Sequence, residues 1–251
     1  MQFRNLINKI GPGVITAALV FGPGSLTVNA KLGAEFGYSL LWVIPVATFF
    51  MMLFTEMSSR VGLQLQQSTL HTIGSTWVRP LPPLDGLGIF LVASSFQAGN
   101  AIGAGVAFAE LSGLPTALWV LVFTGLALGL LRFKSFYNIL EKIMLVLVAL
   151  MLISFLITAF AARPQLHSLV GGLIPSLPEG AQLLTFALIA SSFSIVGAFH
   201  QSYVIQEKSK MGGIFSSTET YTGILILGGI SVLVMICASG ILFAAGKSIG
   251  S

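Results

Sequence analysis

Seven runs of mostly apolar residues divide this sequence, and each is close to the length that crosses a lipid bilayer. A helix needs about 20 apolar residues to span the hydrocarbon core. In hydrocarbon every backbone polar group must be satisfied inside the protein, which leaves only helices and closed barrels. The sequence therefore predicts an all-α integral membrane protein that forms a single transmembrane domain over residues 1–251. The expected spans are 12–35, 38–59, 85–109, 114–131, 136–162, 181–206 and 220–246.

Composition supports this class and excludes several others. Hydrophobic residues make up 55% of the 251 residues and charged residues only 8%, with a mean hydropathy of +0.94. A soluble domain carries about 25% charged residues. The single cysteine, Cys237, excludes an internal disulfide framework. The net charge of +4 comes from few, scattered basic residues, so we expect a lipid bilayer and no nucleic acid as partner.

The distribution of basic residues predicts the orientation of the chain. With a cytoplasmic N-terminus, eight of the twelve Lys and Arg residues fall in cytoplasmic segments, three fall outside, and one lies within the fifth span. Cytoplasmic loops carry such an excess. We therefore expect a bacterial-type cytoplasmic membrane, with the N-terminus cytoplasmic and the C-terminal end of this chain outside. The cytoplasmic residues are Arg4, Lys9, Arg60, Arg79, Arg132, Lys134, Lys208 and Lys210; the outer ones are Lys31, Arg163 and Lys247; Lys142 is the one within a span.

Two of the expected spans carry an interruption. The first contains Gly-Pro-Gly-Ser at residues 22–25, and the sixth is interrupted around "SFSIVGAFHQSY" at residues 192–203. Proline removes a backbone donor, and glycine tolerates most backbone angles. Interrupted helices five spans apart indicate a transporter built from inverted five-helix repeats, with its binding site near the membrane midplane. The alternative is that the first break is only a packing kink.

A few polar side chains at membrane depth are candidates for that site. His200 is the only histidine inside a span and lies at the second interruption. Gln97 and Asn100 share one face of the third span at i, i+3. These residues either line a polar cavity, or they serve as hydrogen-bonded contacts between helices. The sequence contains no recognised enzyme motif, and the three serines near His200 do not form a catalytic triad. We therefore expect no enzyme activity.

Two further groups have open alternatives. Glu56 lies near the cytoplasmic end of the second span, where it either pairs with Arg60 at i, i+4 or lies on a proton path. Asn29 and Lys31 follow the first interruption, and they either line a vestibule or face the lipid headgroups.

Several segments resemble the NRAMP family of divalent-metal transporters. The most specific is "GYSLLWVIPVATFFMMLFTEMSSRVGL" at residues 37–63, which is similar to the family's second helix. Residues 11–38 resemble its first helix, residues 99–122 its third and fourth, and "VGAFHQSYVIQEK" its sixth. The resemblance implies a LeuT-like, APC-type inverted-repeat fold with broken helices 1 and 6, alternating access, and proton-linked uptake of a divalent metal.

The same resemblance shows where the chain departs from the family. The family's first-helix motif is Asp-Pro-Gly-Asn, and here Gly22 and Ser25 take the places of its carboxylate and its amide. Its sixth-helix motif is Met-Pro-His-Asn, where this chain has Ala198, Phe199, His200 and Gln201. The acidic residues that the family uses for proton movement are matched by Gln97 and Asn100. The resemblance therefore implies a neutral site, and the implied binding residues are Gly22, Ser25, Asn100, Ala198, His200 and Gln201, with Gln97, His200 and Glu56 lining the cavity or proton path.

A neutral site favours some cargoes over others. A bare divalent ion in a low-dielectric cavity needs compensating negative charge or a nearly complete hydration shell. His200 alone makes a weak metal site. We therefore expect an NRAMP-like secondary transporter of a hydrated Mg-like ion or of Mn or Fe, with no resident cofactor. The alternatives are a carrier of a small organic solute, and a non-transporting membrane scaffold or sensor that has lost the metal site.

The resemblance also bears on the extent of the bundle. It implies two five-helix repeats, and this chain supplies the first repeat plus helices 6 and 7. We expect either a fragment of a longer protein or a chain that a second subunit completes.

Overall fold

All the regular secondary structure in the described part of the chain is helical. The computed structural model describes residues 23–65, 67–76, 81–130, 137–192, 195–210 and 217–246, and no strand occurs among them. The all-α prediction is therefore confirmed. The elements are α2 (Pro23–Phe36), η1 (Gly37–Leu40), α3 (Val43–Gln64), α4 (Thr69–Thr76), α5 (Leu81–Ser112), α6 (Thr116–Leu130), α7 (Tyr137–Ala162), α8 (Leu166–Gly171), α9 (Gln182–Ser192), α10 (Ile195–Lys210), α11 (Ser217–Ala238) and the π-helical turn η2 (Ser239–Phe243).

The first expected interruption lies at the edge of a described segment, and most of the second lies within α10. Residues 12–22 lie outside the described residues, and α2 is described from Pro23 onward. Residues 193 and 194, between α9 and α10, lie outside them as well. Residues 195–203 belong to the continuous helix α10, so His200 lies inside a helix and not at a break, contrary to the prediction. A break at residues 193–194 and the first interruption stay predictions.

Several described helices are long and apolar enough to cross a membrane. Three pass by length and composition alone: Pro83–Ser112, Gln182–Glu207 and Tyr221–Phe243. The pair Gly24–Leu40 and Val43–Gln64, bent by 109°, passes the same test together. Shorter apolar helices cover Thr116–Leu130 and Val146–Ala162, within two more of the expected spans.

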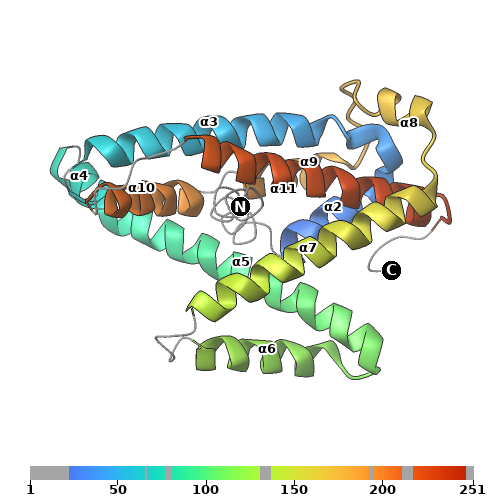
Figure 1. Cartoon of the computed structure of the whole chain (residues 1–251), viewed down its shortest axis with the longest axis horizontal. Helices are drawn as coiled ribbons and strands as arrows, with labels where there is room; N and C mark the ends of the chain where they lie inside the picture. The colour runs from blue at the N-terminus through green and yellow to red at the C-terminus, as the bar shows by residue number, and fades with distance from the viewer. Residues whose placement is uncertain are drawn as a thin grey trace, which may run out of the picture.

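The long helices run back and forth between two ends of the molecule (Figure 1). α3 and α11 lie side by side along the long axis, α2 packs against α11, and α5 crosses below them. α4 lies at one end of this axis and α8 at the other (Figure 1). α6 packs against α5, and none of its residues is buried in the described part of the chain.

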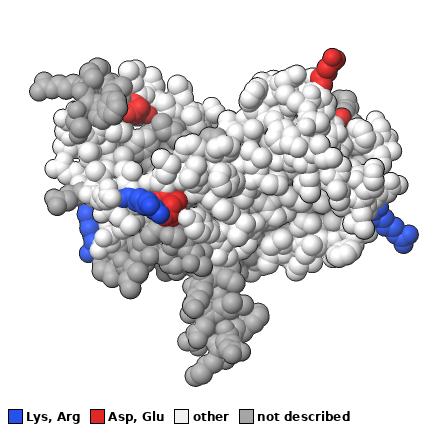
Figure 2. All heavy atoms as spheres, turned by 90° about the horizontal axis from the view of Figure 1, so that it is seen from above, with Lys and Arg blue, Asp and Glu red and all other residues white. Residues whose placement is uncertain are grey.

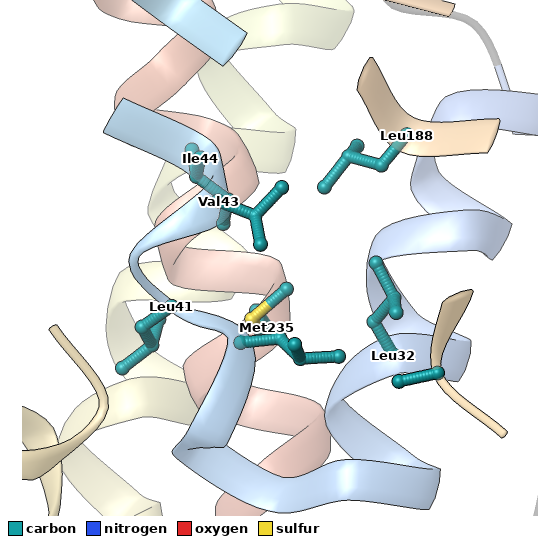
Figure 3. Close-up of a cluster of buried hydrophobic side chains, with 8 residues drawn as sticks. Leu32, Leu41, Val43, Ile44, Leu188 and Met235 are labelled. Atoms are coloured by element: carbon teal, nitrogen blue, oxygen red, sulfur yellow. The ribbon is translucent and has the colours of Figure 1, made fainter. Parts of the chain in front are cut away.

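The core lies where α2, α3, α9 and α11 meet (Figure 3). Leu32, Val43, Leu188 and Met235 each come from a different one of these helices and are at most 3% exposed. A second cluster joins α3 to α11 around Ile230. Burying side chains of this size contributes about 1.5–3 kcal/mol each in water. In a membrane, close packing supplies the corresponding stabilisation.

Glycines allow α2 and α11 to approach each other closely. A Cβ atom at Gly33 would lie 2.6 Å from the carbonyl oxygen of Met235 and 2.9 Å from the Cβ of Ala238. At Gly37 the backbone turns with φ of +59°, and a Cβ there would lie 3.1 Å from the ring of Phe243. The end of α2 therefore lies directly against the end of α11, and η1 lies against η2.

The surface agrees with a membrane environment. On the described part of the face in Figure 2, the charged side chains gather near the two ends of the long axis, and a broad band between them carries none. Large apolar side chains are exposed on several of the described helices, among them Leu121 on α6, which is 74% exposed, and Phe160 on α7, which is 80% exposed. Contiguous apolar surface of this extent is rare on soluble monomers. The chain is therefore built for a lipid surrounding.

The contact between α2 and α11 predicts the effect of adding one methyl group. We expect Gly33→Ala to destabilise the protein by about 1–3 kcal/mol, because the new Cβ overpacks against the backbone of α11. The measurement is the midpoint of thermal unfolding of the purified protein in detergent.

Gly229→Ala is the matched control. Nothing lies within 4 Å of a Cβ at Gly229 on α11, so that variant should be neutral or gain up to about 1 kcal/mol from helix propensity. Equal midpoints for the two variants would contradict the close contact at Gly33.

Candidate functional site

The beginning of α2 is joined to α5 by a hydrogen bond. The backbone N–H of Gly24 donates to Oδ1 of Asn100 over 3.2 Å. The first N–H groups of a helix have no acceptor within the helix, and Pro23 has no N–H at all. Asn100 accepts the hydrogen bond of a backbone donor in the first described turn of α2. It brings α5 to the point where the first interruption is predicted.

Polar groups continue from this junction along α2. Ser25 is 8% exposed, and its carbonyl oxygen accepts a hydrogen bond of 2.9 Å from Nδ2 of Asn29. Asn29 is fully buried, and its Oδ1 has no hydrogen-bond partner among the described residues. Lys31 is instead 40% exposed and forms an ion pair of 3.6 Å with Glu35. Of the two residues that follow the first interruption, Asn29 therefore lies in the protein interior.

Gln201 faces α3. It is 8% exposed, and its Nε2 donates to Oγ of Ser59 over 3.0 Å. The hydroxyl of Ser59 in turn donates to the backbone carbonyl of Thr55 over 2.9 Å. The described contacts of this amide are thus with a helix and not with an open cavity.

His200 has a different surrounding from its neighbour. Its side chain is exposed on the described part of the protein, and Ala198, two residues earlier, is half-buried. α10, which carries both, packs on α3, α4 and α5. No group of three or more His, Cys, Asp or Glu side chains that would share a metal ion occurs within the described ranges.

The structure brings together only some of the predicted site residues. It joins Asn100 to the backbone beside Ser25, whereas Gln97, one turn earlier on α5, is exposed in the described part of the protein. Gly22 lies outside the described residues. Ser59 was not among the predicted site residues, although a hydroxyl residue three positions after Glu56 in the second span was a usable signal.

Glu56 forms the predicted i, i+4 contact. Its Oε1 lies 2.9 Å from Nε of Arg60, with the Glu56 side chain 15% exposed and that of Arg60 72% exposed. The geometry is that of a hydrogen-bonded ion pair at the end of α3. The predicted pairing is confirmed.

Comparison with known sequences gives one family. Residues 13–251 match the family model described as natural resistance-associated macrophage protein-like, or Nramp. The divalent metal cation transporter MntH of Deinococcus radiodurans is 30% identical over 192 residues, which are 75% of this chain and 44% of that protein. The protein of the same description from Chromohalobacter salexigens is 31% identical over 199 residues, 78% of this chain and 44% of the relative. This chain spans about half the length of the curated relatives that it matches.

Solved structures show the same fold. A crystal structure of a mutant of the Eremococcus coleocola manganese transporter has a TM-score of 0.68 and 20% identity, covering 98% of this chain and 52% of that one. The same transporter in complex with an aromatic bis-isothiourea substituted compound has a TM-score of 0.64 and 22% identity, covering 99% and 53%. The predicted LeuT-like fold class is therefore confirmed.

The junction between α2 and α5 predicts a change in stability. We expect Asn100→Ala to destabilise the protein by about 1–3 kcal/mol, because the half-buried N–H of Gly24 then loses its acceptor. Asn100→Asp keeps an acceptor oxygen at this position and should retain most of the stability. Thermal unfolding in detergent measures both variants.

Gln97→Ala serves as the control on the same helix, since its side chain is exposed and should change the midpoint little. If Asn100→Ala unfolds at the same temperature as Gln97→Ala, the stabilising role of the Asn100 hydrogen bond is refuted.

Proposed function

Since this chain belongs to the natural resistance-associated macrophage protein (Nramp) family, we propose that it moves a divalent metal cation across a membrane by alternating access. Its relatives include a divalent metal cation transporter and a manganese transporter. The proposed site differs from a typical metal site because it has neutral residues, Gly22 and Asn100, where carboxylates are expected. The proposed cargo is therefore an ion that keeps much of its water.

The bond between Asn100 and Gly24 carries this proposal. It places an amide side chain, and not a carboxylate, beside the start of α2 and next to Ser25. Carbonyl, hydroxyl and amide oxygens suit hard cations, and Mg²⁺ in particular keeps several waters when it binds. A hydrated Mg²⁺, or Mn²⁺ with most of its water, fits these donors better than a dehydrated transition metal does.

His200 is the proposed imidazole ligand or proton carrier of this site. Gly22, Ser25, Asn100 and the backbone of Ala198 complete the proposed set around it. One neutral imidazole favours transition metals but makes a weak site by itself. We therefore propose that His200 contributes to the affinity for Mn²⁺ more than to the affinity for Mg²⁺.

The protein is an integral membrane protein, and we propose a bacterial-type cytoplasmic membrane as its location. The orientation rests on the distribution of basic residues, with the N-terminus and α4 on the cytoplasmic side. In Figure 1, α4 and α8 lie at opposite ends of the long axis, as this orientation requires. This chain spans about half the length of its curated relatives, and we propose that the transporting unit includes further helices from a longer product or from a second subunit.

Removing the imidazole tests the metal site. We expect His200→Ala to weaken the binding of Mn²⁺ by about tenfold or more, since it removes the one strong ligand for that ion. Binding of Mg²⁺, which prefers oxygen, should change less. Isothermal titration of the purified protein with each ion measures both effects.

His167→Ala is the control, because His167 is an exposed histidine on the separate helix α8. Gly22→Asp combined with Ser25→Asn restores the acidic motif expected for the family and should tighten Mn²⁺ binding. If the wild-type chain binds neither ion and this double variant binds Mn²⁺, the cargo is a non-metal solute or the protein is a non-transporting scaffold.

The orientation predicts which loops can be labelled from outside the cell. A cysteine in place of Glu179, after α8, should react with a membrane-impermeant maleimide in intact cells. A cysteine in place of Gln67, before α4, should react only after the membrane is opened. Both native side chains are exposed, and the native Cys237 is buried, so its background labelling should be low.

The reverse pattern of labelling would overturn the proposed orientation. Equal labelling of both positions in intact cells would show that these two loops lie on the same side.

A further inference from the structure

One continuous face of α10 packs against α3 and against the residues that follow α3. Gln201, Ser202, Ile205 and Gln206 are each at most 8% exposed, and they recur at the spacing of one helix face. The backbone of Ser202 lies so close to α3 that a Cβ at Gly62 would be 2.5 Å from its carbonyl oxygen. α10 is therefore seated directly on the backbone of α3.

Two glutamine side chains hold this face by hydrogen bonds at two positions along α10. Nε2 of Gln201 donates to Oγ of Ser59 over 3.0 Å. Nε2 of Gln206 donates to the carbonyl oxygens of Leu65 and Gln67, over 3.2 Å and 2.9 Å, where α3 has ended. Two anchors on one face hold a helix against both rotation about its axis and sliding along it.

In the hydrogen bond between Gln201 and Ser59, the position of Ser59 is fixed by its surroundings. Its side chain is fully buried, and its hydroxyl has both a donor and an acceptor partner. The hydroxyl proton goes to the carbonyl oxygen of Thr55, which leaves a lone pair directed at the amide of Gln201. The direction of the Gln201 side chain is thereby set by α3.

The direction of His200 follows from that of Gln201. Consecutive residues of an α-helix are separated by about 100° around the axis. With Gln201 held against α3, the side chain of His200 must leave the helix on the adjoining side, where the described part of the protein leaves it exposed. If α10 rotated about its axis, the hydrogen bond to Ser59 would break and the side chain of His200 would change direction at the same time.

We propose that Ser59, acting through Gln201, positions His200 in the metal site, and that Gln201 is a positioning residue and not a ligand. This inference rests on the proposed function, since it concerns the same site. Residues that orient metal ligands typically change metal affinity when they are replaced. Ser59 thus acts on the affinity for metal without contacting the ion.

The test uses Ser59→Ala in the full chain, with Thr69→Val as the matched control. Thr69 on α4 also makes a hydroxyl contact to α10, 2.6 Å from Oγ of Ser202, so both variants remove one hydroxyl contact from the same helix. We expect Ser59→Ala to weaken Mn²⁺ binding by about tenfold, and Thr69→Val to leave it close to wild type. Titration with manganese chloride measures the affinity of each.

A second readout does not depend on metal. Diethyl pyrocarbonate modifies exposed histidines, and the rate at His200 can be followed by mass spectrometry, with His71 and His167 as internal standards. We expect Ser59→Ala to change the rate at His200 alone. Ser59→Thr, which keeps the hydroxyl, should restore the wild-type rate and affinity; if Ser59→Ala does not fold, Gln201→Asn breaks the same contact by shortening the side chain.

The outcomes separate this inference from the proposed function. A changed His200 rate in Ser59→Ala, with no metal binding in the wild type, supports the positioning role and refutes the metal site. Metal binding that depends on His200 and Gln201 but not on Ser59 makes Gln201 a ligand and overturns the inference. Equal effects of Ser59→Ala and Thr69→Val on both readouts also overturn it, since they indicate only a loosened interface.

Discussion

The arrangement of the helices depends on a hydrogen bond between the first described turn of α2 and α5. A free N–H in a low-dielectric surrounding costs as much as a lost hydrogen bond. The side chain of Asn100 accepts the N–H of Gly24 and thereby attaches α5 to α2 at this point. Because α2 also packs against α9 and α11, this one polar contact links the core cluster to the outer helices α5 and α6.

Close packing replaces the hydrophobic effect as the force that holds the helices together. Lipid tails are as apolar as leucine side chains, so helices associate through short contacts and interhelical hydrogen bonds. Gly33 allows α2 to meet the backbone of α11, Gly62 allows α3 to meet that of α10, and Gly105 lets α5 meet Val120 on α6. The polar contacts of Gln201 and Gln206 then select one register among the packings that glycine permits.

The proposed site contains neutral groups, and this decides which cargo it suits. An amide at position 100 binds the backbone of α2 and leaves little negative charge to offset a dehydrated divalent ion. The proposed cargo therefore brings part of its own hydration shell, and selectivity rests on the geometry of neutral oxygens and on the direction of one imidazole. In such a site a residue that only orients His200 has more influence than it would among several charged ligands, because few other groups hold the ion.

The local features of this protein could be predicted from sequence, and its non-local contacts could not. Runs of apolar residues predicted the helices, a contiguous motif predicted the family, and i, i+4 spacing predicted the pair of Glu56 and Arg60, since each depends on neighbours along the chain. The partners of Asn100 and Gln201 lie 76 and 142 residues away. Periodicity shows which face of a helix is polar but not which helix will lie against it. Only the packed bundle decided that Asn100 binds the backbone of α2, and that Gln201 binds Ser59 beside an exposed His200, because those contacts form when separate helices come together.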